Sequence, residues 1–471
     1  MQAEPEPSSP SPEAASRTAP TVLPLRGGTA PEDVFRLHAA LRRRLVPVLG
    51  GEDTAGAGST VLLPHAPEIT GERALAELRA RMRGPVPGGT AAALRTSGST
   101  TGAGRHVALT DRSLVAGADA TAQRLGGPGR WVLAVPAHHV AGFQLLVRTV
   151  VAGTDPVVVD TSEGFDPRAL AAAAARVDLP AFLSLVPTQL GRVLRAGERV
   201  VAPLRRLTGI LVGGAASSPG MLAEARGAGL AVRTTYGMTE TGGGCVYDGV
   251  PLPRVRVRLG EDDRVEIAGP VLAAGYLDGA DPDAFVTSDG LRWHRTRDRG
   301  AFVVEGGRER LRVLGRVDDV VNTGGVKVSP AAVERLLGEH PGVAEVAVVG
   351  VGDEEWGELV TAVVVPRASE RVRLADLRET VRVELGAAHA PRVLVLTEAL
   401  PLRGPGKVDR RATAHLAATA LGRRATAAVS HDPQLPDRAV AHAQPRVTGV
   451  EEHPPHPPSG AGAPDPGSAH I

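Results

Sequence analysis

The segment LTGILVGGAASSPGMLAEARGAGLAVRTTYGMTE, residues 207–240, decides the fold class of this chain. It opens with the apolar run LTGILVGG, continues with the helix-like stretch SPGMLAEARGAG, and returns to a second apolar run, LAVRTTYG (230–237). A strand, a helix and a strand in this order are typical of a βαβ unit with parallel strands. Ligands of such sheets bind beyond the carboxyl ends of the strands. We therefore expect the polar residues after the second run to belong to a binding site.

The same alternation extends upstream and predicts an α/β fold with a large N-terminal domain of helix-covered, mainly parallel sheets. The candidate strands there are RWVLAVPA (130–137), DPVVVD (155–160) and AFLSLVP (181–187). Helices are expected over RSLVAGADATAQRL, GFQLLVRTVVAG and DPRALAAAAARV. From 252 to 314 the pattern changes to β-hairpins, RVRVRLGEDDRVEIAG and GAFVVEGGRERLRVLG, which predict a β-rich subdomain.

A compact, mobile α+β C-terminal domain is predicted to follow, with its first helix beginning after Ser329-Pro330. The domain boundary is placed near Gly315. The expected organisation is a disordered tail over 1–20, a large ligand-binding N-terminal domain over 21–315, a C-terminal domain over 316–424 and a disordered tail over 425–471. The last segment contains five histidines, but their irregular spacing among prolines and glycines favours a solvated tail over a metal site.

Composition excludes several classes of protein. With 53 basic and 52 acidic side chains the net charge is +1, which gives no bulk attraction to nucleic acid or anionic lipid. The single cysteine, Cys245, rules out an intrachain disulfide or a cysteine-based zinc site. No apolar run reaches the ~20 residues that span a bilayer, and the N-terminus lacks the apolar core of a signal peptide. We expect a cytoplasmic protein whose core is built from Ala, Val and Leu, because aromatics make up only 3% of the chain.

The loop RTSGSTTGAGR (95–105) predicts a polyphosphate site. Its glycines allow close backbone approach, successive N–H groups can form an anion-binding nest, and Arg105 adds a fixed positive charge. An ordinary Ser/Thr/Gly surface turn is the alternative. The loop does not fit the Walker pattern G-x-x-x-x-G-K-[ST].

With this loop, TTYGMTET, RTRDRG, GRVDDVVNTGGVKV and RGPGKVDRR in that order, the chain resembles the acyl-adenylate-forming (AMP-binding) superfamily over about residues 90–415. The resemblance implies an enzyme that uses ATP and Mg²⁺ to convert a carboxylate into an acyl-AMP with release of pyrophosphate. Many members then transfer the acyl group to the thiol of coenzyme A. It also implies that the small C-terminal domain alternates between two poses, one for each half-reaction.

The resemblance further implies roles for individual residues in the first half-reaction. Lys407 would bridge the carboxylate and the α-phosphate, Thr239 would hydrogen-bond the α-phosphate, and Glu240 would coordinate Mg²⁺. His139, in VPAHHVAG, would lie beside the acyl pocket, with His138 able to take its place. The implied ATP-binding residues are Thr96, Ser97, Gly98, Ser99, Thr100, Thr101, Gly102, Arg105, Gly213, Gly214, Ala215, Thr235, Tyr236, Gly237, Asp298 and Arg316.

Within this set, Tyr236 would stack on adenine opposite Gly213–Ala215, and Asp298 would bind the ribose hydroxyls. Three positions depart from the family pattern. The phosphate loop is one residue longer than S-G-[ST]-T-G-x-P-K and has Gly104 and Arg105 where proline and lysine are common. Arg297 stands where the family's T-G-D has glycine.

For the second half-reaction the resemblance implies a hinge at Asp318 and places Gly242, Gly243, Gly324 and Gly325 near the acyl group or coenzyme A. Core, surface or turn positions are the structural alternatives for these residues. A homodimer is compatible with the sequence, which does not fix the oligomeric state.

The stretch YGMTETGGGCVYDGVPL resembles most the o-succinylbenzoate–CoA ligases of menaquinone biosynthesis, of the actinobacterial type. Arg148 and Thr188 are candidates for binding the second carboxylate of such a substrate. Another aryl- or acyl-CoA synthetase, and an adenylating enzyme that loads a carrier protein, remain alternatives. A non-catalytic nucleotide-binding protein is disfavoured, because Thr239, Glu240, Asp298 and Lys407 are all present.

Overall fold

The fold was established from a computed structural model, which describes residues 20–52, 60–96, 104–279, 281–367, 370–403, 407–422 and 445–453. The phosphate-loop residues Ser97–Gly102 and most of both predicted tails lie outside these ranges. The chain forms two compact units. The larger ends at Asp319 and also includes Leu402–Val408, and the smaller contains Val320–Pro401 and the described residues from Asp409 onward.

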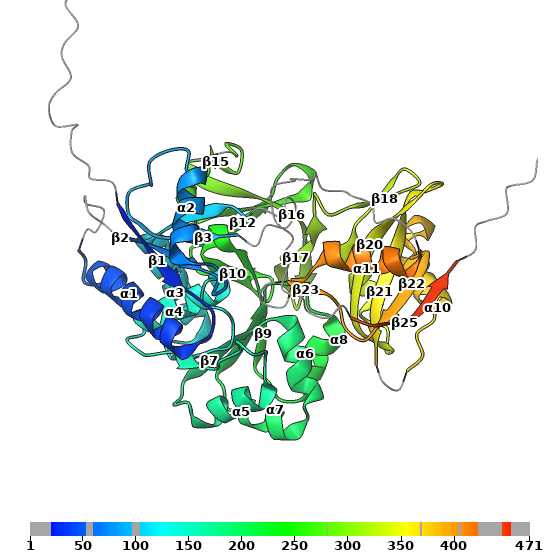
Figure 1. Ribbon diagram of the computed structural model, residues 1–471, viewed down its shortest axis with the longest axis horizontal. Coiled ribbons are helices and arrows are strands. Elements are labelled where there is room, and N and C mark those ends of the chain that lie inside the picture. The colour runs from blue at the N-terminus through cyan, green and yellow to red at the C-terminus, as the bar shows by residue number, and fades with distance from the viewer. Residues whose placement is uncertain are drawn as a thin grey trace, which may run out of the picture. The chain divides into compact units, whose positions relative to one another are not determined.

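The larger unit is organised around a seven-stranded sheet that the segment 207–240 helps to build (Figure 1). Five neighbouring strands are parallel, and two antiparallel strands extend one edge. In spatial order the strands are β11 (Val250–Pro251), β10 (Gly243–Tyr247), β9 (Val232–Met238), β8 (Gly209–Gly213), β7 (Ala181–Leu185), β5 (Arg130–Leu133) and β6 (Val157–Val158). The five strands predicted from the apolar runs thus form one parallel sheet.

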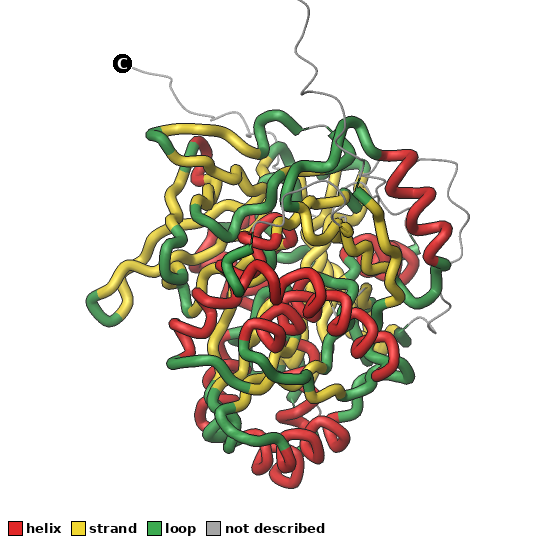
Figure 2. The backbone as a smooth tube through the Cα atoms, turned by 90° about the vertical axis from the view of Figure 1, so that its left-hand side faces the viewer, coloured by secondary structure: helices red, strands yellow, loops and turns green. Residues whose placement is uncertain are grey.

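Helices connect these strands and cover the sheet (Figure 2). The four predicted helices are present as α3 (Asp111–Leu125), α4 (Val140–Val151), α5 (Pro167–Arg176) and α8 (Pro219–Gly227). Two more, α6 (Pro187–Arg195) and α7 (Glu198–Leu204), lie between β7 and β8. Proline at the first turn and a capping Ser218 explain the start of α8, because the Ser218 side chain accepts a hydrogen bond from the Met221 N–H.

A second, five-stranded sheet contains the N-terminal part of the unit. Its order is β1 (Thr21–Arg26), β2 (Thr60–His65), β3 (Thr90–Arg95), β4 (His106–Thr110) and β14 (Gly275–Tyr276), and its helices are α1 (Pro31–Leu49) and α2 (Gly71–Arg81). β1, β2 and β3 are parallel, whereas β4 and β14 are antiparallel to their neighbours. β3 and β4 flank the predicted phosphate loop, and β14 comes from more than 160 positions later in the chain.

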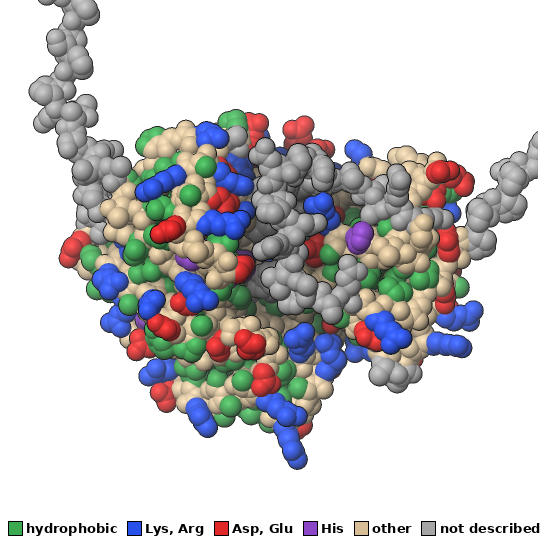
Figure 3. Space-filling model, in the orientation of Figure 1, with side chains coloured by type: hydrophobic (Ala, Val, Ile, Leu, Met, Phe, Trp, Pro, Cys, Tyr) green, Lys and Arg blue, Asp and Glu red, His purple; other side chains and the backbone are tan. Residues whose placement is uncertain are grey.

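The predicted β-rich subdomain is an antiparallel sheet of β12 (Arg256–Leu259), β13 (Arg264–Ala268), β16 (Leu291–Glu305) and β15 (Phe285–Ser288), with β17 (Arg308–Arg316) paired to β16. A one-turn helix, η3 (Glu261–Asp263), joins β12 to β13. The core of the larger unit is mostly Ala, Val and Leu, as the composition predicts, and Tyr247, Phe143 and Phe182 are its largest fully buried side chains. On the face in Figure 3, basic and acidic side chains are interspersed, in keeping with the near-zero net charge.

The smaller unit is an α+β domain. Its sheet has the order β19 (Val326–Val328), β18 (Val321–Thr323), β21 (Gly357–Pro366), β22 (Val393–Thr397) and β25 (Val447–Glu452), with β20 (Val343–Asp353) also paired to β21. The helices are α9 (Pro330–Leu337), α10 (Leu374–Leu385), α11 (Arg410–Ala420) and the short η4 (Ala387–His389). The α/β prediction for the larger unit and the α+β prediction for the smaller one are therefore confirmed.

Two details of the predicted organisation differ from the structure. The larger unit continues past Gly315 to Asp319, because β17 reaches Arg316 and the Val317 N–H still donates to the Arg297 carbonyl at 2.8 Å. The predicted tail over 425–471 contains β25, an antiparallel partner of β22. Its backbone is held by five paired positions, and the Glu451 carboxylate accepts a hydrogen bond from the Leu374 N–H. The remaining tail residues lie outside the described ranges.

Candidate active site

The site begins where β9 leaves the parallel sheet. A one-turn helix, η2 (Thr239–Thr241), follows the strand directly. The Thr241 hydroxyl accepts a hydrogen bond from the Met238 N–H at 3.0 Å and donates to the Gly243 carbonyl at 2.7 Å. This turn fixes Thr239 and Glu240 at the carboxyl end of the strand, which is where ligands of parallel sheets bind.

The glycines around this turn are needed by the backbone itself. Gly242 has a φ of +61° and ends η2, and Gly243 has a φ of +122°. A Cβ on Gly237 would lie 2.0 Å from the Gly243 carbonyl oxygen, because β9 and β10 pair closely here. Gly242 and Gly243 are buried. The backbone conformation therefore requires glycine at these positions. The role of Gly242 and Gly243 beside the acyl group stays a prediction.

Glu240 is held by a tyrosine that the sequence reasoning did not include. The Tyr276 hydroxyl, on β14, donates a hydrogen bond to Glu240 Oε1 at 2.8 Å. Burial, followed by the Glu240 charge, raises the pKa of Tyr276, so this hydroxyl stays protonated. The Arg105 guanidinium stacks 3.4 Å above the centre of the Tyr276 ring. The described residues contain no group of three or more His, Cys, Asp or Glu able to hold a metal ion, so a cation at Glu240 would take its other ligands from phosphate and water.

A second tyrosine–carboxylate pair joins the end of β9 to the middle of β16. The Tyr236 hydroxyl donates to Asp298 Oδ2 at 2.7 Å. Burial raises the pKa of Asp298, while Tyr236 and Arg316 act in the opposite direction. Arg316 Nη1 lies 3.8 Å from Asp298 Oδ1. The structure therefore brings three predicted ATP-binding residues into direct contact with one another.

Arg316 also holds the predicted hinge residue. Its Nε and Nη2 donate to the two oxygens of Asp318 at 2.8 and 2.9 Å. Arg297, which departs from the family's glycine, contributes a further contact from its Nη1 to Asp318 Oδ2 at 3.3 Å. Asp318 lies one residue before Asp319, where the main segment of the larger unit ends. Its hinge role stays a prediction.

Lys407 belongs to a short two-stranded element, β23 (Leu402–Arg403) and β24 (Lys407–Val408), that packs with the larger unit. Its Cε lies 3.6 Å from the position that a Cβ on Gly214 would take. Burial, Arg403 and Arg316 lower the pKa of Lys407, whereas Asp298 and Glu240 raise it. The ammonium group is therefore within electrostatic reach of both site carboxylates.

The two histidines after β5 are half-buried and neutral. His139 is the N-cap residue of α4, and its ring centre is 4.3 Å from that of His138. Burial lowers the pKa of His138 to about 3 and that of His139 to about 4, and Lys407 contributes to the second shift. Gly27 packs against His138, since a Cβ there would lie 2.5 Å from the His138 Cβ. The Lys407 charge thus acts directly on His139.

The adenine wall predicted from Gly213, Gly214 and Ala215 follows β8. Gly213 is paired with Thr235 of β9, and a Cβ on Gly213 would lie 2.1 Å from the Thr235 hydroxyl oxygen. Gly214 has a φ of +85°. These glycines let the ends of β8 and β9 approach each other, next to Tyr236 and Lys407.

The neck of the predicted phosphate loop explains one departure from the family pattern. The Thr96 N–H donates to the Arg105 carbonyl at 2.8 Å, and the Arg105 N–H donates to the Thr96 hydroxyl at 2.9 Å. A Cβ on Gly104 would lie 2.0 Å from the Thr96 carbonyl oxygen, so no larger residue fits this neck. Arg105 pairs with Asp278 at 3.4 Å and Asp281 at 3.8 Å. The predicted phosphate contacts of Ser97–Gly102 fall on residues outside the described ranges.

Gly324 and Gly325 form the turn between β18 and β19 in the smaller unit. Their φ values are +55° and +79°, which explains the two glycines. Trp356 covers the turn: a Cβ on Gly324 would lie 2.9 Å from its ring, and the Gly324 N–H donates to the Trp356 carbonyl at 2.9 Å. The sequence did not point to this tryptophan. The role of Gly324 and Gly325 toward coenzyme A stays a prediction.

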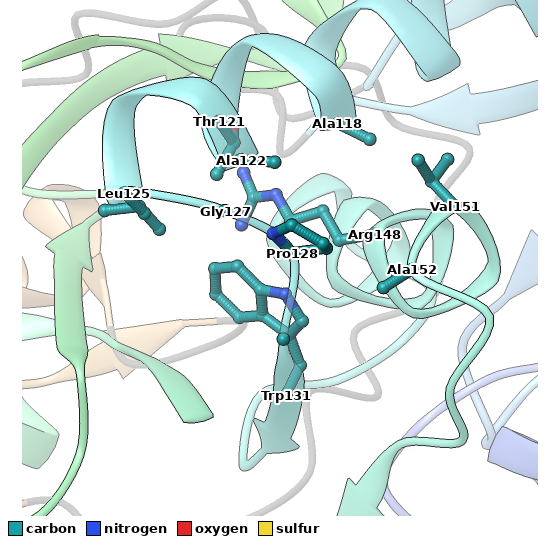
Figure 4. A pocket seen from close by; sticks show the side chains of 11 residues that line it. Ala118, Thr121, Ala122, Leu125, Gly127, Pro128, Trp131, Arg148, Val151 and Ala152 are labelled. Carbon is teal, nitrogen blue, oxygen red and sulfur yellow. The ribbon is translucent and has the colours of Figure 1, made fainter. Parts of the chain in front are cut away.

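The candidates for the second substrate carboxylate separate in the structure. Thr188 is in the first turn of α6, which follows the carboxyl end of β7. Arg148 is nine residues beyond His139 on α4, about 13 Å along the helix axis. It packs on Trp131, at the start of β5 (Figure 4), whereas His138 and His139 follow the other end of that strand. His139 and Arg148 thus stand near opposite ends of α4, and the suggestion that Arg148 binds the second carboxylate stays a prediction.

Comparison with known proteins agrees with this geometry. The family model described as AMP-binding enzyme matches residues 47–277, and the one described as AMP-binding enzyme C-terminal domain matches residues 332–407. The chain belongs to the AMP-binding enzyme family. The C-terminal match ends on Lys407, the lysine whose pKa Asp298 and Glu240 raise.

Individual members of the AMP-binding family are also similar to this chain. A probable 2-succinylbenzoate–CoA ligase of Mycobacterium tuberculosis is 43% identical over 319 residues, covering 67% of this chain and 82% of that protein. The medium/long-chain-fatty-acid–CoA ligase FadD8 of the same organism is 29% identical, covering 76% and 67%. The R195K variant of Escherichia coli MenE with bound OSB-AMS has a TM-score of 0.64 at 24% identity, covering 88% and 90%, and shows the shared fold. The prediction of an AMP-forming acid–thiol ligase is confirmed at the level of this enzyme class.

The described residues contain no helix with the length and hydropathy needed to cross a membrane.

Proposed function

We propose that this AMP-binding enzyme is an ATP- and Mg²⁺-dependent o-succinylbenzoate–CoA ligase that serves menaquinone biosynthesis. In the first half-reaction a substrate carboxylate oxygen attacks the α-phosphorus of ATP, the bond to the pyrophosphate oxygen breaks, and pyrophosphate leaves. In the second, the thiol of coenzyme A attacks the acyl carbonyl and AMP leaves. The observation that supports the first step most directly is that Lys407 lies beside Gly214 at the end of β8, where Asp298 and Glu240 both act on its charge.

The charges at the site suit the first step. Joining a carboxylate to a triphosphate brings anions together, so the enzyme must supply positive charge where negative charge builds up. Lys407 is a partly buried ammonium group near the end of β8, and its partial removal from water strengthens its interaction with a neighbouring anion. Burial and the Lys407 charge keep His139 neutral, so Lys407 is the positively charged member of these two residues.

The two carboxylates suit different parts of ATP. Glu240 offers a hard oxygen ligand, which Mg²⁺ prefers, and the hydrogen bond from Tyr276 fixes its orientation. A bound magnesium ion neutralises phosphate charge. Asp298 is oriented by Tyr236 and is suited to accept hydrogen bonds from ribose hydroxyls.

The choice of o-succinylbenzoate rests on relatives. The 43% identical Mycobacterium tuberculosis protein, a probable 2-succinylbenzoate–CoA ligase, favours this acid over a fatty acid, whose ligase FadD8 is 29% identical. A fatty acid is the second candidate because FadD8 matches a larger share of this chain.

Pyrophosphate release with a panel of carboxylates tests the proposal. The panel contains o-succinylbenzoate, benzoate, octanoate and palmitate, each with ATP and Mg²⁺ and each with and without coenzyme A, and mass spectrometry identifies the product. We expect turnover and a thioester with o-succinylbenzoate only when coenzyme A is present. Equal or faster release with benzoate or either fatty acid would overturn the substrate assignment. A signal that ignores coenzyme A, with no thioester, would overturn the CoA ligase assignment.

A further inference from the structure

Arg105 is held against the ring of Tyr276 by a carboxylate whose place is set by strand register. β4 and β14 pair antiparallel, and just beyond β14 the Leu277 N–H donates to the His106 carbonyl at 2.9 Å. The next pair in this register is Arg105 and Asp278, so their side chains lie on the same face. Tyr276 stands two residues before Asp278 and therefore shares that face. Register alone thus brings the cation, the ring and the carboxylate together.

These three side chains are in contact. Arg105 Nε donates to Asp278 Oδ1 at 3.4 Å, and the guanidinium carbon lies 3.4 Å from the centre of the Tyr276 ring. The Asp278 side chain is 14% exposed and that of Arg105 25%, so solvent screens the pair only in part. Asp281 Oδ2 is less specific, since it lies 3.8 Å from Arg105 Nη1 and 3.9 Å from Arg297 Nη2. Asp278 is therefore the carboxylate best placed to fix the guanidinium.

The ring that Arg105 covers carries the hydroxyl that holds Glu240. The Tyr276 hydroxyl donates to Glu240 Oε1 at 2.8 Å, and the Ala273 N–H donates to the Glu240 carbonyl at 2.8 Å. Side chain and backbone of Glu240 are thus both attached to the segment that leads into β14. A guanidinium stacked on one ring face limits how far the ring can tilt. Such a tilt would move the hydroxyl away from Glu240.

A second arginine of the larger unit is held on an aromatic ring in the same way. The Arg258 guanidinium carbon lies 4.0 Å from the centre of the Trp293 ring. Glu266 and the exposed Asp289 pair with this arginine at 2.7 and 3.1 Å. The Trp293 ring nitrogen donates to a backbone carbonyl and not to a site carboxylate. Loss of Asp289 therefore removes the same kind of contact without a hydrogen bond from the ring to the metal ligand.

We propose that Asp278 is a positioning residue for the magnesium site. It holds Arg105 on the ring of Tyr276, and the hydroxyl of that ring holds Glu240. The inference rests on the proposed function of Glu240 as the Mg²⁺ ligand. Without the Asp278 carboxylate the guanidinium is free to leave the ring for other anions, including the phosphates of ATP. Glu240 would still reach the metal, but its oxygen would be less well oriented, so the affinity for Mg²⁺ falls.

The effect of Mg²⁺ on ATP affinity tests this role without turnover. Isothermal titration calorimetry of the full chain, with no carboxylate substrate present, measures the Kd of ATP with and without Mg²⁺. We expect the factor by which Mg²⁺ tightens ATP binding to be roughly two- to fivefold smaller in Asp278→Asn than in the wild type. Asp278→Glu should keep most of the wild-type factor, because a carboxylate still faces Arg105. The matched control Asp289→Asn should keep all of it.

A double variant shows whether Asp278 acts through Arg105. In an Arg105→Met background, Asp278→Asn should cause no further change in this factor. The same factor in Asp278→Asn as in the wild type, or an equal loss in both backgrounds, would overturn the role of Asp278. A wild type whose ATP affinity ignores Mg²⁺ would refute the metal role of Glu240 and this inference with it. Failure of every acid in the pyrophosphate assay, with the expected calorimetric pattern, would instead refute the ligase function and support the role of Asp278.

Discussion

Two tyrosine–carboxylate pairs make nearly the same hydrogen bond in this molecule. Tyr236 donates to Asp298 at 2.7 Å, and Tyr276 donates to Glu240 at 2.8 Å. In the first pair an arginine, Arg316, approaches the carboxylate, whereas in the second an arginine, Arg105, stacks on the tyrosine ring. The first carboxylate thus has a cation 3.8 Å from one of its oxygen atoms, and in the second pair the cation lies over the ring of the tyrosine that holds the carboxylate. We infer that Asp298 is built to hold hydroxyls and Glu240 to hold a cation, and the predictions below test this division.

The largest effect on activity is expected for Lys407, whose pKa both carboxylates raise. Lys407→Ala should slow pyrophosphate release by roughly 10²–10³-fold, because it removes the buried cation near the reacting phosphate. It should still convert preformed acyl-AMP to thioester. Stopped-flow assays of the separate half-reactions measure both. Lys327→Ala, at the chain's other lysine, is the control for pyrophosphate release. Equal loss in both half-reactions would contradict the assignment of Lys407 to adenylation.

The pH dependence of the same group gives a related test. Burial and the neighbouring arginines lower the pKa of Lys407, so its ammonium loses its proton at a lower pH than a free lysine. Adenylation kcat/KM should therefore fall on the alkaline side at a pH below the ordinary lysine value of 10.5. Lys407→Arg should remove this alkaline limb, since arginine stays charged. An unchanged limb in Lys407→Arg would assign the titration to another group.

The metal side of the comparison is tested by Glu240→Gln. We expect the Mg²⁺ concentration for half-maximal pyrophosphate release to rise about 10- to 100-fold, because an amide oxygen is a weaker ligand than a carboxylate. A magnesium titration at saturating ATP measures it. Asp298→Asn, the same chemical change in the other pair, is the matched control and should leave the Mg²⁺ requirement unaltered.

The ribose side is tested by Asp298→Asn in its own right. Replacing this carboxylate should raise the KM for ATP by roughly tenfold, because hydrogen bonds to a charged acceptor are stronger than those to an amide. 2′-Deoxy-ATP sharpens the assay, since the wild type should discriminate against it and the variant should do so less. Equal discrimination by both proteins would mean that Asp298 does not face the ribose.

The smallest effects are expected from the tyrosines. Tyr236→Phe and Tyr276→Phe each remove one hydroxyl, and each should cost about three- to tenfold in kcat/KM. We expect the two variants to differ in which constant rises. The KM for ATP should rise in Tyr236→Phe, and the Mg²⁺ concentration for half-maximal activity should rise in Tyr276→Phe. The same signature in both variants would break the division between the two pairs.

Much of this site could be predicted from local sequence. Thr239 and Glu240 follow a recognisable strand, and Lys407 stands in a glycine-flanked loop, so their positions at an α/β site follow from strand–helix alternation. The partners of these residues could not be predicted. Asp298 is 62 positions from Tyr236, and Tyr276 is 36 from Glu240. Such pairs depend on which strands become neighbours, and no local pattern carries that information.

Two further placements show the same dependence on distant partners. Arg148 is close to His139 in sequence, but α4 carries it about 13 Å along its axis to the other end of the sheet. β25 comes from a segment whose composition is typical of a tail, and it is ordered by pairing with β22. In both cases a partner distant in sequence decides the outcome.

The sequence by itself determined the fold class, the order of the elements and the residue types available for chemistry, because strand and helix periodicity and glycine requirements are local properties. The tertiary structure was needed to show that Tyr236 holds Asp298, that Tyr276 holds Glu240, and that Arg148 is buried against Tyr247 and Trp131. Strand order decides which side chains become neighbours and how far apart their charged groups lie. Burial decides the dielectric environment in which these groups interact. The chemistry of each charged group follows from that environment.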